Sequence, residues 1–402
     1  MKSSPFIYGN TVSISSFTNR EEEAKKLSNN LLGGINTMII SPRRWGKSSL
    51  VEKVISDINK KDKKCKTIII DLFSVSSEHE FLELYAKEII KASSSKWQEW
   101  VTSGKEFFKK IIPKINLGID PTTDFSVSFD WKELKKHSDE ILNLAETIAK
   151  KKGIKFIICL DEFQNLSSFN QFEIFEKKMR SIWQRQKLVT YCIYGSKRHM
   201  MNDIFNNPSK PFYRFGDIIL LQKIKTIKWV NYITKSFANT KKNILPQDAE
   251  LIPLYMKNHS WYVQQLAHYT WNLTQRKATI IEIEKALDEL IQANTPLYQK
   301  EIENISITQL NLLKAVANGE SKFMSTVIMQ QYHLGTPRNV SKNKTILINN
   351  DIIHLVKDVY EFLDPAFELW FKKQFFQQSY KILDSGMVEE VIVKYKSLKK
   401  KS

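Results

Sequence analysis

The segment 41–49, SPRRWGKSS, brings together residue types that hold a phosphate group. Gly46 lets the backbone approach an anion, Lys47 supplies a cation for the β and γ phosphates of a nucleotide, and the hydroxyl of Ser48 is an oxygen ligand for Mg²⁺. A helix-like run follows, and the positive N-terminal end of a helix attracts phosphate. The spacing therefore predicts a phosphate-binding loop for ATP with Mg²⁺. Its predicted residues are Ser41, Pro42, Arg43, Arg44, Trp45, Gly46, Lys47, Ser48 and Ser49.

Ser41 stands where such a loop ordinarily begins with glycine. That position mainly requires a small residue, and Pro42 restricts Ser41 to an extended conformation. We therefore interpret the serine as compatible with the loop. A Gly-Lys-Ser sequence after a strand also arises by chance, so this interpretation needs support from a second site.

Two consecutive carboxylates supply that second site. In KFIICLDEFQNL, residues 155–166, apolar positions lead to Asp161 and Glu162 at the end of a predicted strand. Ligands bind at the carboxyl ends of strands in open α/β sheets. On a buried strand that neighbours the loop strand, Asp161 would hold Mg²⁺ and Glu162 would be the general base for the attacking water. A single acid at a strand end is a common cap, but two acids in this order after the loop favour nucleotide binding.

Two further positions are candidates for catalysis. The apolar run VTYCIYGSK ends at Gly195 and Ser196. Ser196 would either sense the γ phosphate or position water, or it belongs to a plain strand exit. Arg214 precedes the next apolar run and is either a surface arginine or an arginine finger that reaches the nucleotide of a neighbouring subunit. Arg198 is a second candidate for that role. The predicted catalytic residues are Glu162, Asp161, Ser196 and Arg214.

The elements that must position these residues alternate in type along the first half of the chain. Strand-like apolar runs alternate with helix-like segments, which predicts an α/β fold with a parallel sheet sandwiched by helices. The runs are apolar almost throughout, as expected for strands buried on both faces. The predicted strands are 37–41, 66–73, 155–162, 189–196 and 217–221, and predicted helices include 20–32, 47–60 and 170–186.

The sequence predicts four parts in the chain. Residues 1–222 form a P-loop ATPase domain with an insertion at 93–132, in which the alternating stretch DFSVSFDW is a hairpin or a lid. Residues 223–300 are helical throughout and form a lid domain. Residues 301–380 are predicted as three helices followed by a β-hairpin, the plan of a winged helix, and 381–402 form a basic tail.

Composition indicates a cytoplasmic protein without a membrane anchor. The longest apolar runs are about five residues, against roughly 18 for a membrane span, and MKSSPFIYGNTV lacks the apolar core of a signal peptide. The three cysteines form no CxxC pair, and Cys159 and Cys192 are predicted as buried thiols, which suits a reducing compartment. The seven histidines do not fall at metal-ligand spacings, so no metal site built from protein ligands is expected.

The net charge of the chain is +18, from 61 Lys and Arg against 43 Asp and Glu. Much of the excess lies in lysine runs at 60–66, 150–152 and 396–402. These runs are either solvated surface or an electrostatic footprint for nucleic acid. Charge by itself does not separate the two interpretations.

The third helix of the predicted winged helix carries residues suited to DNA. Arg338, Lys342 and Lys344 lie near its start and would contact phosphates. Asn339 and Asn343 could reach base edges in the major groove. The alternatives are a solvated helix face and a module for protein contact. The predicted partners are thus ATP and DNA, with a protein partner or a homo-oligomer as the alternative to DNA.

The segments SPRRWGKSSL, CLDEFQNL, YGSKRHMM and PFYRFGDIILLQKI together resemble the archaeal-type ATPases of the AAA+/STAND superfamily. FTNREEEAKKL resembles the family's segment near the adenine, and YEFLDPAFELWFKKQF resembles the end of its winged helix. NHSWYVQQLAHYTW resembles a lid motif in which a turn opens a helix near the γ phosphate. There Asn258 and Ser260 replace the usual Gly and Pro, and asparagine can adopt the left-handed conformation at low cost. The resemblance covers residues 5–375 and implies an ATPase domain, a lid and a winged helix.

Three functional hypotheses follow from these features. The favoured one is an ATP-hydrolysing molecular switch that acts on DNA or a protein through its winged helix, with slow turnover in the absence of that partner. The second is a DNA-binding regulator in which nucleotide is a structural ligand. The third is an oligomerising signalling or defence scaffold. Glu162 favours the first, because a protein that only binds nucleotide does not need a general base.

Overall fold

The computed structural model describes residues 3–9, 19–93, 116–118, 126–128, 137–356 and 358–380. The chain divides into two compact units. The nucleotide-domain unit comprises Arg20–Arg43 and Lys47–Gln222, and the C-terminal unit comprises Met1–Asn19, Arg44–Gly46 and Lys223–Ser402.

Most of the predicted insertion at 93–132 and the whole predicted tail at 381–402 lie outside the described residues. Within the insertion, β3 (Asn116–Gly118) and β4 (Ser126–Ser128) pair antiparallel. Residues 126–128 of DFSVSFDW are thus in a β-strand, and both interpretations of the segment, a hairpin or a lid, stay predictions.

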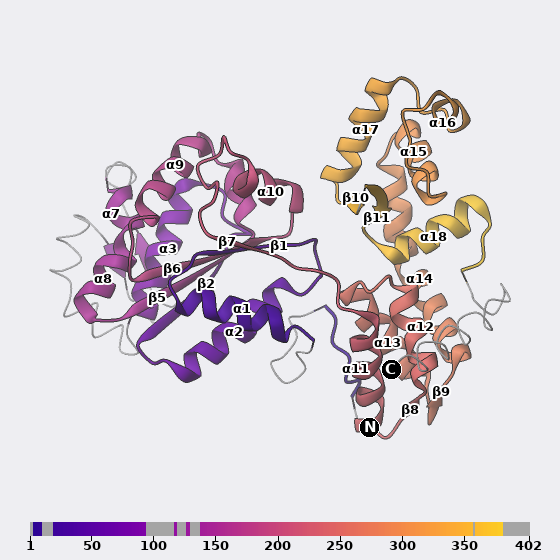
Figure 1. Cartoon of the computed structure of the whole chain (residues 1–402), viewed down its shortest axis with the longest axis horizontal. Helices are drawn as coiled ribbons and strands as arrows, with labels where there is room; N and C mark the ends of the chain where they lie inside the picture. The colour runs from indigo at the N-terminus through magenta and orange to yellow at the C-terminus, as the bar shows by residue number, and fades with distance from the viewer. Residues whose placement is uncertain are drawn as a thin grey trace. The chain divides into compact units, whose positions relative to one another are not determined.

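A five-stranded parallel sheet in the order β2-β5-β6-β1-β7 forms the centre of the nucleotide-domain unit. Its strands are β1 (Thr37–Ile40), β2 (Cys65–Asp71), β5 (Lys155–Asp161), β6 (Val189–Gly195) and β7 (Asp217–Leu220). Helices cover both faces of this sheet (Figure 1). On one face lie α1 (Glu21–Leu32) and α2 (Lys47–Lys61), and on the other α3 (Glu78–Ala92), α7 (Ser138–Leu142), α8 (Leu144–Lys152), α9 (Phe172–Trp183) and α10 (Arg198–Asn206). The predicted strands and the predicted α/β sandwich are confirmed.

Burial separates the central strands from the edge strands. Every residue of β1 and β6 is buried, and Cys159 and Cys192 are buried thiols as predicted. At the two edges of the sheet, Ile69 of β2 is 40% exposed and Leu220 of β7 is 50% exposed. The expectation of burial on both faces is therefore wrong for β2 and β7, because helices cover an edge strand less completely than a central one.

The C-terminal unit is mainly helical and has its own hydrophobic core. Its first part comprises α11 (Thr226–Asn239), α12 (Pro246–Tyr255), α13 (Ser260–Leu273) and α14 (Ile280–Glu303). The two-residue strands β8 (Asn243–Ile244) and β9 (Lys277–Ala278) pair there, so the prediction that 223–300 is helical throughout is wrong at that point. No helix among the residues that the structure describes is long and apolar enough to cross a bilayer.

The end of the C-terminal unit has the predicted plan of a winged helix. Three helices come first, α15 (Ile307–Ala317), α16 (Thr326–Gln331) and α17 (Pro337–Asn349). An antiparallel pair follows, β10 (Ile353–Val356) with β11 (Val359–Phe362), and then α18 (Pro365–Phe376). Side-chain caps mark where the helices begin, since Ser306, Ser325, Thr336 and Asp364 each accept a backbone N–H of the first turn.

Candidate functional site

The polar residues predicted at strand ends meet at the carboxyl edge of the sheet. The loop follows β1, Asp161 ends β5, and Ser196 follows β6. The loop follows β1 and the acid pair lies at the end of β5, and β6 lies between these two strands in the sheet. The expectation that these two strands are direct neighbours is therefore wrong. The same strand order places Ser196 between the loop and the acids.

The predicted phosphate-binding loop has a left-handed backbone at two positions, Arg44 (φ +63°) and Gly46 (φ +90°). Gly46 adopts its conformation without the strain that a Cβ would add. Lys47 is 5% exposed, and its ammonium donates to the carbonyl oxygens of Ser41 and Pro42 at 3.1 and 3.0 Å. Ser41 is buried, and its hydroxyl donates to the Pro42 carbonyl. The serine thus fits where glycine is usual.

Two side chains of the loop have partners in α13 and the turn before it. Arg44 and Trp45 group with the C-terminal unit. The Arg44 guanidinium lies 4.6 Å from the centroid of the Trp261 ring, a cation–π contact, and Trp45 meets His259 edge to face. Asn258 has a φ of +58°, so this turn adopts the left-handed conformation predicted for it.

The two residues predicted to bind Mg²⁺ are in direct contact. The Ser48 hydroxyl donates to a carboxylate oxygen of Asp161 at 2.9 Å, and the other oxygen accepts the backbone N–H of Glu162 at 2.8 Å. Burial raises the pKa of Asp161 to about 6, against the opposing effect of these hydrogen bonds. A hydroxyl beside a carboxylate is an oxygen ligand set that suits a hard divalent cation such as Mg²⁺.

Glu162 is held by hydrogen bonds to its carboxylate. It accepts the Ser196 hydroxyl at 2.8 Å, the Ser196 backbone N–H at 3.3 Å and the side-chain amide of Gln164. Burial raises the pKa of Glu162, but the hydrogen bonds from Gln164 and Ser196 outweigh it, so the pKa lies below the ordinary value. The carboxylate is therefore ionised at neutral pH. Because a low pKa makes it a weak base, it is better suited to orient a water molecule than to abstract a proton from it.

A chain of hydrogen bonds joins the loop to Glu162. Arg43 donates through Nε to the Ser196 hydroxyl at 3.2 Å, and that hydroxyl donates onward to Glu162. Ser196 therefore does more than end a strand, because it contacts both the loop and the acid pair. No sequence motif links Arg43 to Ser196, since they lie 153 residues apart along the chain.

Gln164 is a candidate site residue that sequence analysis missed. It is 1% exposed and donates to Glu162 from η1 (Phe163–Ser168), the 3₁₀ helix that follows β5. A Cβ at Gly195 would lie 1.9 Å from the Gln164 Oε1 atom, so only glycine leaves room for this amide. The available signal was an amide two residues after the second acid in LDEFQ.

The two arginine-finger candidates lie apart from these contacts. Arg214 is exposed in the turn before β7, with its guanidinium 5.2 Å from the Tyr213 ring centroid. Arg198 is exposed at the start of α10. Within the described part of the chain, no hydrogen bond or ion pair joins either arginine to the loop or to the acid pair. A role for Arg214 would therefore depend on a second copy of the chain.

Helix α17 presents only part of the predicted DNA-contacting set to solvent. Arg338, Asn339 and Lys342 are exposed, and Arg338 and Lys342 lie one turn apart on one face. Lys344 instead places its ammonium 5.2 Å from the ring centroid of Tyr360. Asn343 is 8% exposed and donates to Thr308 of α15 at 3.0 Å. The expectation that Asn343 reaches a base edge is therefore wrong, because its amide holds two helices together.

Comparisons with known proteins agree with this architecture. A family model described as a probable winged helix domain matches residues 296–373. A Walker-type ATPase of Pyrococcus abyssi is similar in structure, with a TM-score of 0.64 and 16% sequence identity over 92% of this chain and 99% of that chain. The sequence matches no curated protein.

Two structures of the ORC2 protein of Aeropyrum pernix are also similar. One, with ADPNP and ADP, has a TM-score of 0.55 and 13% identity over 95% of this chain and 96% of that chain. The other, the ADP form, has a TM-score of 0.52 and 13% identity over 89% and 95%. The chain thus has the P-loop ATPase fold with a C-terminal winged helix, and the resemblance to archaeal-type AAA+ ATPases is confirmed at the level of the fold.

Proposed function

We propose that this chain binds ATP with Mg²⁺ and hydrolyses it. The observation that carries the proposal is the contact between Ser48 and Asp161, which brings together the two predicted Mg²⁺ ligands from 113 residues apart. Lys47 lies beside them and would exchange its bonds to loop carbonyls for bonds to phosphate oxygens. Mg²⁺, when bound, would neutralise charge on the β and γ phosphates. The ADPNP and ADP of the similar ORC2 structures support the choice of an adenine nucleotide.

The hydrogen-bond chain suggests how hydrolysis would be controlled. Glu162 would orient the attacking water, and its hydrogen bonds to Ser196 and Gln164 hold the carboxylate in place. Arg43 donates to the same serine from the loop that would hold the phosphates. A change in the loop on nucleotide binding would therefore reach Glu162 through one hydroxyl group. Arg214 would serve a neighbouring copy of the chain as an arginine finger.

The test is Mg²⁺-dependent ATP hydrolysis by the full chain and three variants. Glu162→Gln should retain ATP binding and lose about 100-fold in turnover, because a neutral amide replaces the carboxylate that would orient the attacking water. Lys47→Ala should weaken ATP binding by about tenfold or more, because a charged hydrogen bond to phosphate is lost. Asp71→Asn is the matched control, since Asp71 ends the neighbouring strand β2 and is exposed. Parental turnover in Glu162→Gln would refute the role of Glu162 in orienting the attacking water, and parental affinity in Lys47→Ala would refute the loop assignment.

We further propose that the winged helix is the output element and that DNA is its partner. The exposed face of α17 with Arg338, Asn339 and Lys342 supports this, together with the net charge of +18. Binding of double-stranded DNA can be measured by fluorescence anisotropy at several salt concentrations. In Arg338→Ala/Lys342→Ala, the slope of the logarithm of the binding constant against the logarithm of the salt concentration should become less steep by about two. Lys344→Ala is the control, because that ammonium lies over Tyr360.

The same measurements distinguish the alternative functions. DNA binding without any ATP turnover would favour a regulator in which nucleotide is a structural ligand. Nucleotide-dependent assembly in light scattering would favour an oligomerising scaffold. Unchanged DNA binding in the double variant, with ATP turnover indifferent to DNA, would indicate a protein partner instead.

We also propose the division of the chain into a P-loop ATPase domain at 1–222, a lid at 223–300, a winged helix at 301–380 and a tail at 381–402. The boundary at 222 coincides with the end of the nucleotide-domain unit at Gln222, whereas Met1–Asn19 group with the C-terminal unit and the boundary at 300 falls in the last turn of α14. Strand β7 ends at Leu220 and α11 begins at Thr226, while α14 ends at Glu303 and α15 begins at Ile307. Limited proteolysis with mass spectrometry should cut first near these junctions.

A further inference from the structure

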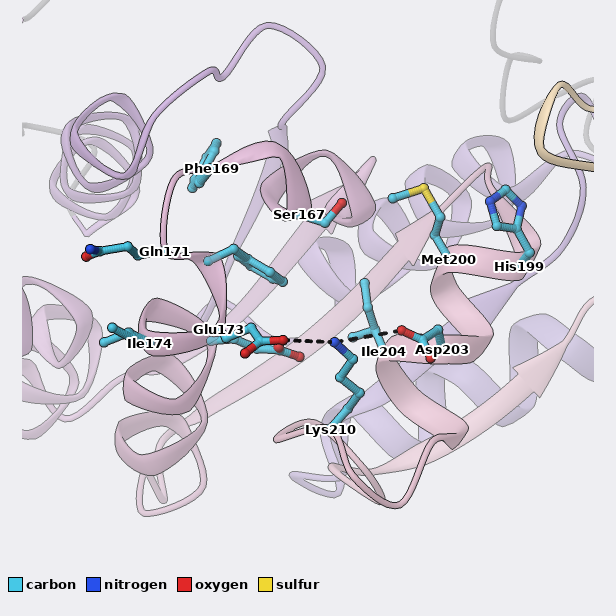
Figure 2. A pocket seen from close by; sticks show the side chains of 12 residues that line it. Ser167, Phe169, Gln171, Glu173, Ile174, His199, Met200, Asp203, Ile204 and Lys210 are labelled. Carbon is cyan, nitrogen blue, oxygen red and sulfur yellow. Dashed lines mark ion pairs between the residues drawn. The ribbon is translucent and has the colours of Figure 1, made fainter. Parts of the chain in front are cut away.

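We propose that a pocket between α9 and α10 binds a small organic cation, an alkylammonium compound with an apolar body. This α9–α10 pocket has a volume of about 700 Å³, within the range of small-molecule sites (Figure 2). Its lining contains no residue of the phosphate-binding loop and neither member of the acid pair. It is therefore a site distinct from the nucleotide site.

The charges of the α9–α10 pocket are mostly negative. Three carboxylates line it, those of Glu173, Glu176 and Asp203, together with a single ammonium, that of Lys210. The pocket thus has a local excess of negative charge in a chain whose net charge is +18. The Lys210 ammonium lies 3.7 Å from Glu173 and 3.9 Å from Asp203 (Figure 2). Both distances exceed a hydrogen bond, so Lys210 offsets the charge without satisfying either carboxylate.

Glu176 gives independent evidence that the pocket suits a cation. It is fully buried, and neither of its carboxylate oxygens has a hydrogen-bond partner. A carboxylate in such surroundings is unfavourable unless a donor reaches it. Burial raises the pKa of Glu176 to about 7, although the nearby Lys210 ammonium lowers it. A ligand ammonium carries three donors and would satisfy this carboxylate.

Apolar side chains in the same pocket define the rest of the ligand. Phe169, Phe172 and Ile204 line it and are largely buried. Aromatic rings favour a nearby cation as well as an alkyl chain. The four-carbon stem and ammonium of Lys210 already combine these two features inside the pocket. A ligand of the same kind would take the place of the Lys210 ammonium.

Isothermal titration calorimetry of the full chain at pH 8 with pentane-1,5-diamine tests the proposal. We expect saturable one-to-one binding, and no comparable binding of the neutral analogue pentan-1-ol. Glu176→Gln should weaken diamine binding by about tenfold or more, because one buried charged hydrogen bond is lost. Lys210→Met should strengthen it by about tenfold, because the competing ammonium is removed.

Two controls separate charge recognition from folding. Glu289→Gln makes the same chemical change on the exposed surface of α14 and should bind the diamine within about twofold of the parent. Glu176→Gln keeps the side-chain shape and removes a buried charge, so it should fold and hydrolyse ATP like the parent. ATP turnover thus distinguishes failure of this proposal from failure of the proposed ATPase function.

Binding should also weaken from pH 8 to pH 6, because Glu176 takes up a proton in this range. The other titratable groups near it are Glu173, Lys177, His199, Asp203 and Lys210. Glu176→Gln should remove most of this pH dependence. A pH dependence unchanged in that variant would assign the titration to one of the other groups and contradict the role given to Glu176.

Three kinds of result would overturn the proposal. The first is no diamine binding by the parent up to the millimolar range. The second is equal binding by parent and Glu176→Gln, or equal binding of diamine and pentanol. The third is a lysine-containing peptide that binds more than about tenfold tighter than the diamine, which would make the pocket a docking site for a polypeptide.

Discussion

Replacing Asp161 with asparagine should stabilise the protein without nucleotide and remove the added stability that Mg²⁺-ATP confers. The carboxylate has a pKa of about 6 against an ordinary 3.8. Two pKa units correspond to about 3 kcal/mol of unfavourable free energy for the ionised form in the folded chain at pH 7.5. Asparagine removes this charge but offers Ser48 a less favourable hydrogen bond, which costs about 1 kcal/mol. The expected net gain is about 2 kcal/mol.

The gain should depend on pH in one direction. A carboxyl group whose pKa is raised by folding destabilises the folded state above that pKa, and the penalty disappears as the pH falls toward 3.8. The carboxylate penalty in the parent should therefore fall to about half between pH 7.5 and pH 5. The difference between variant and parent should shrink accordingly.

Urea unfolding followed by circular dichroism, with and without Mg²⁺-ATP, measures both effects. At 100 times its dissociation constant, Mg²⁺-ATP should stabilise the parent by about 2.7 kcal/mol and Asp161→Asn much less. Asp71→Asn is the control, because Asp71 lies opposite Asp161 in the register of β2 and β5 but is exposed. Its effect should stay within about 0.5 kcal/mol. A less stable Asp161→Asn would refute the burial argument, and undiminished stabilisation by Mg²⁺-ATP would refute the assignment of Asp161 as a Mg²⁺ ligand.

Three other substitutions test the geometry around the site. Ser196→Ala removes a hydrogen bond to Glu162, so the pKa of that carboxyl should rise and the acid limb of the pH–rate profile should shift to higher pH. An acid limb at the parental pH would contradict the link between Ser196 and Glu162. Gly195→Ala places a Cβ in the space that the Gln164 amide occupies, so turnover should fall about tenfold while ATP affinity is retained. Parental turnover in this variant would show that the position of Gln164 does not matter for hydrolysis. Gly46→Ala puts a Cβ on a residue with φ +90°, which strains the loop by about 1–2 kcal/mol, so ATP affinity measured by calorimetry should fall about tenfold. An unchanged affinity would exclude close contact between this backbone and a phosphate.

Local patterns were sufficient for the parts of the site that follow one another along the chain. The loop with Lys47 and Ser48 was predicted because glycine, lysine and hydroxyl must be adjacent to surround a phosphate. Asp161 and Glu162 were predicted because a buried strand reads as an apolar run and its end is visible in the sequence. The winged helix was predicted for the same reason, since the spacing of apolar residues within each of its helices and strands is visible in the sequence.

What the sequence alone could not determine is what depends on strand order and packing. Placing β6 between β1 and β5 is a tertiary result, and it brings Ser196 and Arg43 into one hydrogen-bond chain with Glu162.

The same limit applies to side chains whose direction is set by their neighbours. Asn343 and Arg338 lie on one helix, yet packing against α15 buries the first and leaves the second in solvent. The unpartnered carboxylate of Glu176 is likewise ordinary in the sequence and exceptional only in the folded pocket. Residue type and spacing thus determined which chemistry this chain could perform, and tertiary structure decided which side chains meet to perform it, because hydrogen bonds and burial depend on distance in space.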